Sequence, residues 1–331
     1  MKKYNSIILA AGHGTRMHSN KAKVLHKILD KTLIECVLSS LKFAGINDKI
    51  IIVGDHKEDV IKSLDKQNVI FAEQKQQLGT GDAVKAAIQY IKDDQNYLIL
   101  YGDMPLISKE TIQNFINYYE TNNLKAAIIT ATLDNPFGYG RIIYNNNSFE
   151  KIVEEKDASE IEKEIKESNV GVYLFNGKLL KKALNNLSNN NAQHEYYLTD
   201  TLEICKNLGH NIGIYKMPNT TEFTNVNTRK ELEKATNIYM QNVLDKHFFN
   251  GVTIVNKNNT YISSDAIIGQ DTIIYPGTII EGATIIGENC IIGPNTKIIN
   301  SKINDNTSIE YSKIMNKTIE ANSIISPFEN I

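Results

Sequence analysis

The chain has 331 residues, about twice the length of a typical domain, so we expect two domains and a sizeable buried core. Its composition, with 41% hydrophobic and 22% charged residues, is that of an ordinary soluble globular protein. The 36 basic and 38 acidic residues leave a formal charge of -2, which excludes a sequence-independent hold on nucleic acid or on an anionic membrane. Any phosphate-binding site must therefore be local.

No targeting or membrane-spanning segment is predicted. The longest apolar stretch near the N-terminus, residues 7–11, is too short for a signal peptide or a membrane span, so we expect a cytoplasmic protein without membrane insertion. Three widely spaced cysteines, Cys36, Cys205 and Cys290, are too few and too scattered for a disulfide framework or a zinc knuckle. We interpret them as buried or spectator thiols.

Up to about residue 226, short β-branched runs alternate with helical patterns. Strands are expected at residues 6–10, 49–53, 69–72, 97–101 and 126–131, and helices at 33–44, 80–91 and 108–119, with Thr80 and Ser108 as N-caps. This alternation predicts an α/β, doubly wound, mainly parallel, Rossmann-like sheet. Ligands of such sheets bind at the carboxyl ends of the strands, so motifs that directly follow strands are the strongest functional candidates.

A long helical stretch, residues 228–248, is followed by a repeat of six residues. Isoleucine stands at positions 262, 268, 274, 280, 286, 292 and 298, and the pattern continues with one-residue slips at 303, 309, 314, 319 and 325. This period predicts a connector helix and then a left-handed parallel β-helix with the isoleucines inside. A β-sandwich would instead show alternation with period two, broken by variable turns.

The predicted solenoid has no polar cap at Ile331. An open coil exposes unpaired backbone and its apolar interior. We therefore expect the chain to be the front part of a longer protein, or to be protected at that end by another subunit.

The first chemical motif, residues 9–17 (LAAGHGTRM), directly follows the first strand, and Lys23 comes soon after it. Gly12 and Gly14 allow the backbone to approach a polyphosphate with its N–H groups, while Arg16 and Lys23 add positive charge. The spacing differs from both the GxGxxG of dinucleotide-binding folds and the GxxxxGK of P-loops.

Two further motifs follow later strands. In residues 73–83 (EQKQQLGTGDA), the Gln74 amide offers a donor and an acceptor to a pyrimidine edge, and the turn at Gly79 and Thr80 offers a flat seat. Read alone, the same glycines only make a loop before a helix cap. In residues 101–106 (YGDMPL), Asp103 ends a buried strand; it is either a turn residue or, beside a phosphate loop, a Mg²⁺ ligand.

These motifs resemble the LxxGxGTRM loop and downstream lysine of sugar-phosphate nucleotidyltransferases. With residues 23–26 (KVLH) and the hexapeptide tail, nearly the whole chain resembles the bacterial bifunctional N-acetylglucosamine-1-phosphate uridyltransferase/glucosamine-1-phosphate acetyltransferase family. The resemblance implies a nucleotidyltransferase domain over residues 1–227, a connector helix over 228–249 and a partial β-helix over 250–331. It reaches only the first part of the acetyltransferase half, so we expect no acetyl transfer from this chain alone.

The resemblance also implies substrates and site residues. The substrates are UTP and N-acetylglucosamine 1-phosphate, the product is UDP-N-acetylglucosamine for the cell envelope, and the β-helix makes a homotrimer. UTP would contact Leu9, Ala10, Ala11, Gly12, Gly14, Gln74, Gly79, Thr80, Tyr101 and Gly102, with Arg16 and Lys23 as the catalytic cations. Mg²⁺ would bind Asp103 and Asn227, and the sugar would bind Gly138, Glu154 and Asn169.

Several points stay open at this stage. Asp82 stands where the family usually has His, and Asn225 where it usually has Gly. Without the resemblance, Glu154 and Glu155 belong to a solvated charged run that extends to Glu167. Residues 191–200 resemble the family's EYYLTD stretch, whose Glu195 and Tyr197 are candidates for the sugar pocket or for simple packing.

Histidines 13, 18, 26 and 194 lack metal-ligand spacing and are interpreted as surface or core residues. The alternative functions are a uridylyl- or thymidylyltransferase acting on glucose 1-phosphate and a non-catalytic nucleotide-sugar-binding scaffold.

Overall fold

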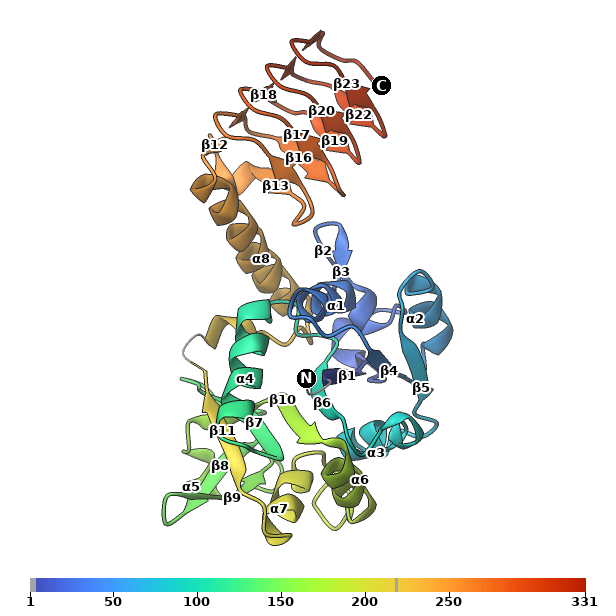
Figure 1. The fold of residues 1–331 in the computed structure, drawn as a ribbon, viewed down its shortest axis with the longest axis vertical. Coiled ribbons are helices and arrows are strands. Elements are labelled where there is room, and N and C mark those ends of the chain that lie inside the picture. The colour runs from blue at the N-terminus through green and yellow to red at the C-terminus, as the bar shows by residue number, and fades with distance from the viewer. Residues whose placement is uncertain (1–3, 218–219) are drawn as a thin grey trace. The chain divides into compact units, whose positions relative to one another are not determined.

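The computed structural model describes residues 4–217 and 220–331, which divide into two compact units (Figure 1). The first unit contains residues 4–26 and 32–231, and the second contains Lys27–Lys31 and Leu232–Ile331. Within the described ranges, no helix combines the length and the apolar character needed to cross a membrane.

A mixed sheet forms the centre of the first unit, in the strand order β11-β7-β10-β6-β1-β4-β5. The strands are β1 (Tyr4–Leu9), β4 (Lys49–Val53), β5 (Ile70–Glu73), β6 (Asn96–Tyr101), β7 (Ala126–Thr132), β8 (Arg141–Asn145), β9 (Ser148–Val153), β10 (Glu167–Asn176) and β11 (Ile212–Lys216). β1 pairs in parallel with β4 and β6, whereas β10 runs antiparallel to β6 and β7. The predicted doubly wound sheet is confirmed, and each of the five expected strands ends within two residues of its prediction.

Helices cover both faces of this sheet. α1 (Leu33–Phe43), α2 (Lys57–Ser63) and α4 (Lys109–Thr121) pack with one buried cluster, and α3 (Thr80–Lys85), α6 (Gly177–Asn185) and α7 (Asp200–Asn207) with the other; α5 (Glu160–Lys163) is a single short turn. In β6, Leu98 and Leu100 join the first cluster while Tyr97 and Ile99 join the second. Successive side chains of a strand point to opposite faces, so a sheet covered on both sides needs the nearly continuous apolar strands seen in the sequence.

One of the two predicted helix caps is confirmed. The Ser108 hydroxyl accepts a hydrogen bond from Thr111 N at 3.1 Å at the start of α4. The prediction for Thr80 was wrong: α3 has Gly79 as its N-cap, with φ of 112°, and the Thr80 hydroxyl instead accepts from Leu198 N at 3.0 Å. Thr80 therefore forms a tertiary hydrogen bond instead of the helix cap that the local sequence predicts.

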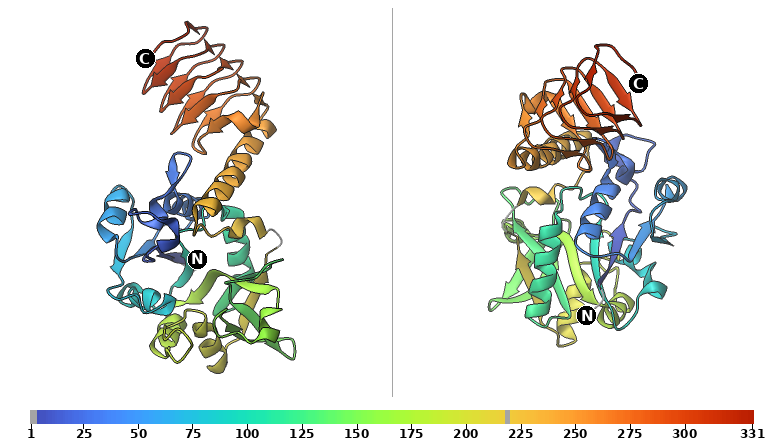
Figure 2. Two further views of the ribbon diagram at one scale, coloured as in Figure 1. Left: turned by 180° about the vertical axis from the view of Figure 1, so that it is seen from behind. Right: turned by 45° about the horizontal axis from the view of Figure 1, so that its top comes forward.

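The second unit begins with most of α8 (Arg229–Phe249) and continues as a three-sided parallel β-helix, whose stacked coils are visible in Figure 2. One side is formed by β12 (Thr253–Ile254), β15 (Ile273–Ile274), β18 (Ile291–Ile292), β21 (Ser308–Ile309) and β24 (Ile324–Ile325). The second is formed by β13 (Thr260–Ile262), β16 (Thr278–Glu281), β19 (Lys297–Ile299) and β22 (Lys313–Met315), and the third by β14 (Ile267–Ile268), β17 (Ile285–Ile286), β20 (Lys302–Ile303) and β23 (Thr318–Ile319). The predicted left-handed hexapeptide β-helix is confirmed.

The slips in the repeat shorten the coils without moving the core. Ile280 pairs with Ile298 at a separation of 18 residues, whereas Ile303 pairs with Ile319 at a separation of 16. From Ile262 to Ile319 the repeated isoleucines are at most 8% exposed. Asn300 and Asn316, at coil corners, have φ of 45° and 55°, a left-handed conformation that Asn tolerates. The corners absorb the missing residues, so each repeated isoleucine from Ile262 to Ile319 still points inward.

A small hairpin, β2 (Lys27–Ile28) and β3 (Lys31–Thr32), groups with the β-helix. Lys31 Nζ lies 2.7 Å from Asp265 Oδ1, and Asp30 Oδ2 accepts from Gly282 N at 3.0 Å. The chain therefore contributes to the second unit twice, once between the phosphate-loop region and α1 and once after residue 231.

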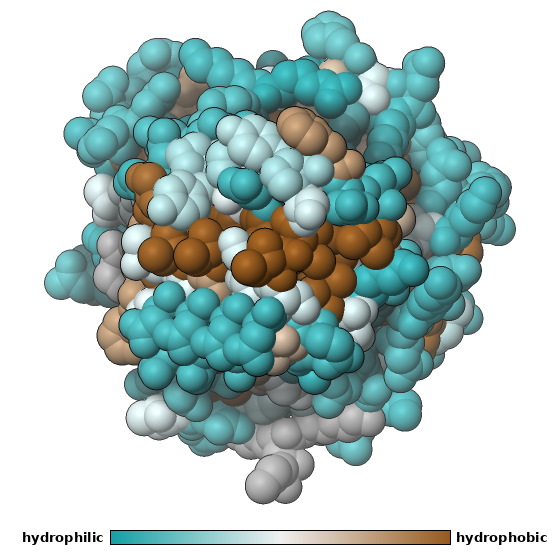
Figure 3. Space-filling model, turned by 90° about the horizontal axis from the view of Figure 1, so that it is seen from above, coloured by the Kyte–Doolittle hydropathy of each residue, from teal (hydrophilic) through white to brown (hydrophobic). Residues whose placement is uncertain are grey.

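The view in Figure 3 shows a band of apolar residues bordered by polar ones. In the last coil, Ile324 and Phe328 are each 84% exposed.

Candidate functional site

A cavity of about 250 Å³ opens where β1, β5 and β6 end. Its lining consists of Leu9, Ala10, Ala11, Gly12, Lys23, Val24, Gln74, Gln77, Gly79, Thr80, Ala83, Tyr101, Asp103 and Glu195. The sequence analysis predicts the site at this carboxyl edge of the sheet. Three motifs that lie far apart in the chain meet here, and the cavity lies wholly within the first unit.

The phosphate-loop motif is held by its neighbours. Ala10 N donates to Ile52 O at 2.9 Å, and Gly102 N donates to Leu9 O at 2.9 Å, so the loop starts from the sheet. Gly14 has φ of 64°, and a Cβ there would lie 2.8 Å from Lys23 Cβ. Only glycine combines this conformation with so close an approach, and the loop is thereby packed against Lys23.

The ammonium of Lys23 joins two oxygens from distant parts of the chain. It forms an ion pair with Asp103 Oδ2 and donates to Asn227 Oδ1 at 2.8 Å, across 204 residues of sequence. The second carboxylate oxygen, Asp103 Oδ1, is buried without a hydrogen-bond partner. The predicted pair Asp103 and Asn227 is therefore brought together, with both side chains directed at one positive charge.

These two residues fit a divalent cation. Mg²⁺ commonly takes only one or two protein oxygens and completes its shell with water and phosphate, so a carboxylate and an amide oxygen are a suitable donor set. The buried Asp103 Oδ1, which has no hydrogen-bond partner among the described residues, is a further acceptor on the same carboxylate. Over the described residues, no group of three His, Cys, Asp or Glu side chains has the arrangement of a metal site.

Gln74 is fixed by two acceptors. Its Nε2 donates to Gly79 O at 3.1 Å and to Asp82 Oδ2 at 2.9 Å. With both amide hydrogens engaged, Gln74 Oε1 is the group left for a ligand in the cavity. Asp82, which replaces the family's usual His, thus orients the side chain proposed to recognise the base.

The glycines of this turn are required by packing. A Cβ at Gly79 would lie 2.6 Å from Tyr196 O, and one at Gly81 would lie 2.9 Å from the same atom. Gly81 N donates to Tyr196 O at 2.7 Å. Residues 195–198 therefore pack against the turn, and Glu195, a candidate for the sugar pocket or for packing in the sequence analysis, lies at the wall of this cavity.

The predicted sugar-side residues lie behind Tyr101. A Cβ at Gly171, two residues after Asn169, would lie 2.3 Å from the Tyr101 ring. Asn169 is buried, accepting from Gly171 N at 2.8 Å and donating to the Tyr173 hydroxyl at 2.8 Å. Burial first, and then the charge of Glu154, raise the pKa of Tyr101, which places Glu154 near the same ring.

Glu154 and Glu155 do not belong to a solvated charged run, so the interpretation made without the resemblance was wrong. Glu154 accepts from the Thr199 hydroxyl at 2.9 Å, and burial raises the pKa of its carboxyl group. Glu155 Oε2 lies 2.7 Å from Nη2 of the buried Arg141 and accepts from Gly138 N at 3.0 Å. The Glu155 carboxylate therefore holds the loop that carries Gly138.

The lining of this cavity does not include every predicted site residue. Gly14, Arg16, Gly102, Gly138, Glu154, Asn169 and Asn227 are outside the lining of the cavity. Arg16 is exposed on the short 3-10 turn Thr15–Met17. Conversely, Val24, Gln77 and Ala83 line the cavity without having been predicted, and Gln77 Nε2 donates to Ala11 O at 2.8 Å. Gln77 lies three residues after Gln74 in the motif of residues 73–83. Its place in that motif is the sequence feature that could have predicted its role in the cavity.

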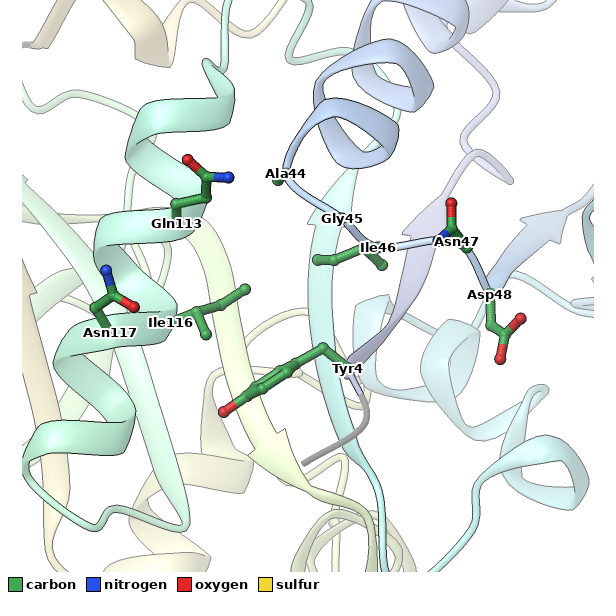
Figure 4. A pocket seen from close by; sticks show the side chains of 9 residues that line it. All are labelled: Tyr4, Ala44, Gly45, Ile46, Asn47, Asp48, Gln113, Ile116 and Asn117. Atoms are coloured by element: carbon green, nitrogen blue, oxygen red, sulfur yellow. The ribbon is translucent and has the colours of Figure 1, made fainter. Parts of the chain in front are cut away.

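A larger hollow, of about 420 Å³, lies at the opposite, amino end of β1 and β4 (Figure 4). Gln113 and Asn117 of α4 lie on one side of it, and Tyr4 and Asn47 on the other. Its lining, all within the described residues, includes Asp48 but no Lys or Arg. A polyphosphate would find no cationic side chain there, so the smaller cavity is the candidate active site.

An α/β sheet with a glycine-rich loop and a cation site at its carboxyl edge, followed by a hexapeptide β-helix, defines a nucleotidyltransferase with a hexapeptide tail. A family profile described as "MobA-like NTP transferase domain" matches residues 6–190, and one described as "Bacterial transferase hexapeptide (six repeats)" matches residues 265–300. A putative glucose-1-phosphate thymidylyltransferase from Bacillus anthracis, solved in complex with a sucrose, superposes with a TM-score of 0.60 over 71% of this chain and 94% of its own; at 21% identity it supports the fold alone.

Relatives with higher identity define the family. The bifunctional protein GlmU of Clostridioides difficile (strain 630) is 45% identical over 98% of this chain and 71% of its own length. The protein of the same name from Geobacillus sp. (strain WCH70) is 46% identical over 100% of this chain and 72% of its own length. The chain belongs to the GlmU family and is a nucleotidyltransferase.

Proposed function

We propose that the chain transfers a uridylyl group from UTP to N-acetylglucosamine 1-phosphate, giving UDP-N-acetylglucosamine and pyrophosphate for the cell envelope. One observation carries the proposal: Asp103 and Asn227 converge on the Lys23 ammonium at the wall of a cavity that also contains the glycine loop and the Gln74 turn. Membership of the GlmU family supports this reaction over one with glucose 1-phosphate.

UTP lies along the cavity. Its uracil rests on the turn of Gly79 and Thr80, where Gln74 Oε1 accepts from the base N3–H, because the Gln74 amide hydrogens are already bonded within the protein. Its phosphates follow the backbone N–H groups of the loop after Ala10, residues 11–14, because Ala10 N is already bonded to Ile52 O. Tyr101 closes the side of the cavity next to the sugar.

The reaction is an in-line displacement at the α-phosphorus. A phosphate oxygen of the sugar phosphate forms a new P–O bond, the bond to the β-phosphate bridging oxygen breaks, and pyrophosphate leaves with that electron pair. The nucleophile is already an anion, so no general base is needed. Catalysis depends on holding two anions together and neutralising their charge, which is the role of Lys23 and Arg16.

Asp103 and Asn227 are the residues that would hold Mg²⁺. When bound there, the ion supplies positive charge to the phosphate oxygens and so lowers the repulsion between the two substrates. Glu154, Asn169 and the backbone at Gly138 would bind the acetamidosugar, since a neutral sugar needs a few placed carboxylate and amide groups.

A pyrophosphate-release assay with UTP tests the function. The sugar 1-phosphates of glucose, glucosamine and N-acetylglucosamine are compared, each with and without Mg²⁺. We expect release with N-acetylglucosamine 1-phosphate, dependent on Mg²⁺. Preference for glucose 1-phosphate, or nucleotide binding without release, would favour the alternative functions instead.

We also propose a homotrimer through the β-helix. The support is the hexapeptide repeat, whose three flat sides carry exposed apolar residues such as Ile291, Tyr261 and Ile267. Light scattering coupled to size exclusion tests it: a mass of one chain at micromolar concentration contradicts the trimer.

A further inference from the structure

The first turn of α8 contains a capping box that reaches one residue further than usual. The Thr228 hydroxyl accepts from Glu231 N at 3.2 Å, and Glu231 Oε2 accepts from Thr228 N at 2.8 Å. The same oxygen also accepts from Asn227 N at 2.8 Å. The carboxylate that caps the helix therefore also fixes the backbone of Asn227.

Asn227 is held from a second direction. Val226 N donates to Asp103 O at 3.0 Å, which joins the backbone of Asp103 to the residue directly before Asn227. With Asn227 fixed between this bond and Glu231, only its two side-chain torsions are left to place Oδ1, which accepts from Lys23 Nζ at 2.8 Å. Glu231 thus limits where the Asn227 oxygen can lie relative to the Asp103 carboxylate.

The charge of Glu231 is felt at the site as well. The pKa of the Tyr139 hydroxyl is raised, first by burial and then by the negative charges of Glu231 and Asp103. Both carboxylates therefore act on this one side chain.

We propose that Glu231 is a positioning residue that holds Asn227 ready to bind a divalent cation together with Asp103. This inference rests on the proposed assignment of the cation to Asp103 and Asn227. It goes beyond that assignment because Glu231 touches neither substrate nor metal and acts through the Asn227 backbone. Partners that orient metal ligands in this way commonly change metal affinity by about 10–100-fold when removed.

The chain contains a matched control. At the start of α1, Glu35 Oε2 accepts from Thr32 N at 2.7 Å and the Thr32 hydroxyl accepts from Glu35 N at 3.3 Å, a capping box of the same residue types. Its carboxylate holds no proposed ligand. Glu35→Ala and Glu231→Ala therefore each remove a helix cap of the same kind, at a cost of about 1 kcal/mol in stability. Only Glu231→Ala also removes the hydrogen bond that holds the Asn227 backbone.

The test measures Mn²⁺ binding to the nucleotide-free full chain, with free Mn²⁺ followed by electron paramagnetic resonance. We expect Glu231→Ala to weaken binding about 10-fold or more, Glu35→Ala to leave it unchanged, and Glu231→Gln, which keeps an acceptor oxygen but not the charge, to give an intermediate value. Raising the Mg²⁺ concentration should restore the turnover of Glu231→Ala, because the defect lies in affinity.

Two results overturn the inference in distinguishable ways. If Asn227→Ala weakens Mn²⁺ binding while Glu231→Ala binds as well as Glu35→Ala does, Glu231 is only a helix cap. If Asn227→Ala itself binds normally, the proposed cation assignment fails, and the role of Glu231 with it. Should Glu231→Ala not fold, Glu231→Gln decides: normal Mn²⁺ affinity and normal turnover at low Mg²⁺ contradict the proposal.

Discussion

Gln74 Nε2 lies 2.9 Å from Asp82 Oδ2 and donates its hydrogen to that oxygen. This contact leaves Gln74 Oε1 as the group that faces the base, and an acceptor there suits the N3–H of uracil but not the unprotonated N3 of cytosine. Removing the Asp82 carboxylate would free Gln74 to turn its amide over. We therefore predict that Asp82→Ala accepts CTP better, with the ratio of kcat/KM for UTP over CTP falling about 10-fold, as expected when one orienting hydrogen bond of about 1–1.5 kcal/mol is lost.

Two measurements separate this effect from general damage. Asp82→Asn keeps a side-chain oxygen for Gln74, so its UTP preference should stay close to that of the parent chain. The pyrophosphate-release rates with both nucleotides give the ratio directly. An unchanged ratio in Asp82→Ala would show that Gln74 does not depend on Asp82 for its orientation.

Lys23 is predicted to be the main protein cation at the site. Replacing it with Ala should lower kcat by about 10²–10³, comparable with the loss of one charge-stabilising donor, because its ammonium lies against Asp103 and Asn227. Lys21→Ala is the control, since that side chain is exposed and outside the cavity lining. Near-normal turnover of Lys23→Ala at saturating substrate would contradict the mechanism.

Much of the fold was predictable because local sequence patterns determine its elements. The six-residue isoleucine period and the strand–helix alternation both report a buried face, and burial dominates the energy of such elements. The antiparallel direction of β10 was not predicted. Both faces of this strand are covered, so its residues 170–175 are as apolar as those of a parallel strand. The sequence pattern therefore does not distinguish the two directions.

The site was predictable where a motif follows a strand, as for Gly12, Gln74 and Asp103. It was harder where a contact depends on tertiary packing. Thr80 bonds Leu198 instead of capping α3, and Glu155 pairs with a buried Arg141 rather than facing water. The closeness of Asn227 to Asp103 came from family resemblance alone, because no local pattern links residues so far apart.

Asp200 at the start of α7 should make stability depend on pH. Burial, followed by the charges of Glu203, Glu154 and Asp157, raises the pKa of its carboxyl group from 3.8 to about 6. The folded chain then holds this proton more tightly than the unfolded chain, so stability falls as pH rises from about 4 to about 6. We predict that Asp200→Asn stabilises the chain by about 1–2 kcal/mol at pH 8, after allowance for solvent screening, and by much less near pH 4.

Thermal unfolding at both pH values checks this prediction. Asp94→Asn, a change at an exposed aspartate, serves as the control and should move the midpoint little at either pH. An equal gain from Asp200→Asn at pH 4 and pH 8 would mean that the stabilisation does not come from removing a charge.

Gly171 should be required for the shape of the cavity. It has φ of 82°, and a Cβ there would lie 2.3 Å from the Tyr101 ring. Gly209 has nearly the same φ, 84°, but a Cβ there would have nothing within 4 Å. Both substitutions to Ala incur the left-handed strain of about 1–2 kcal/mol, whereas only Gly171→Ala must also push Tyr101 out of place. We predict that Gly171→Ala raises KM for UTP and for the sugar phosphate, while Gly209→Ala keeps both values and shows only a lower unfolding temperature. If the two variants lose stability alike and both keep normal kinetics, Tyr101 does not form the shared wall between the nucleotide and the sugar.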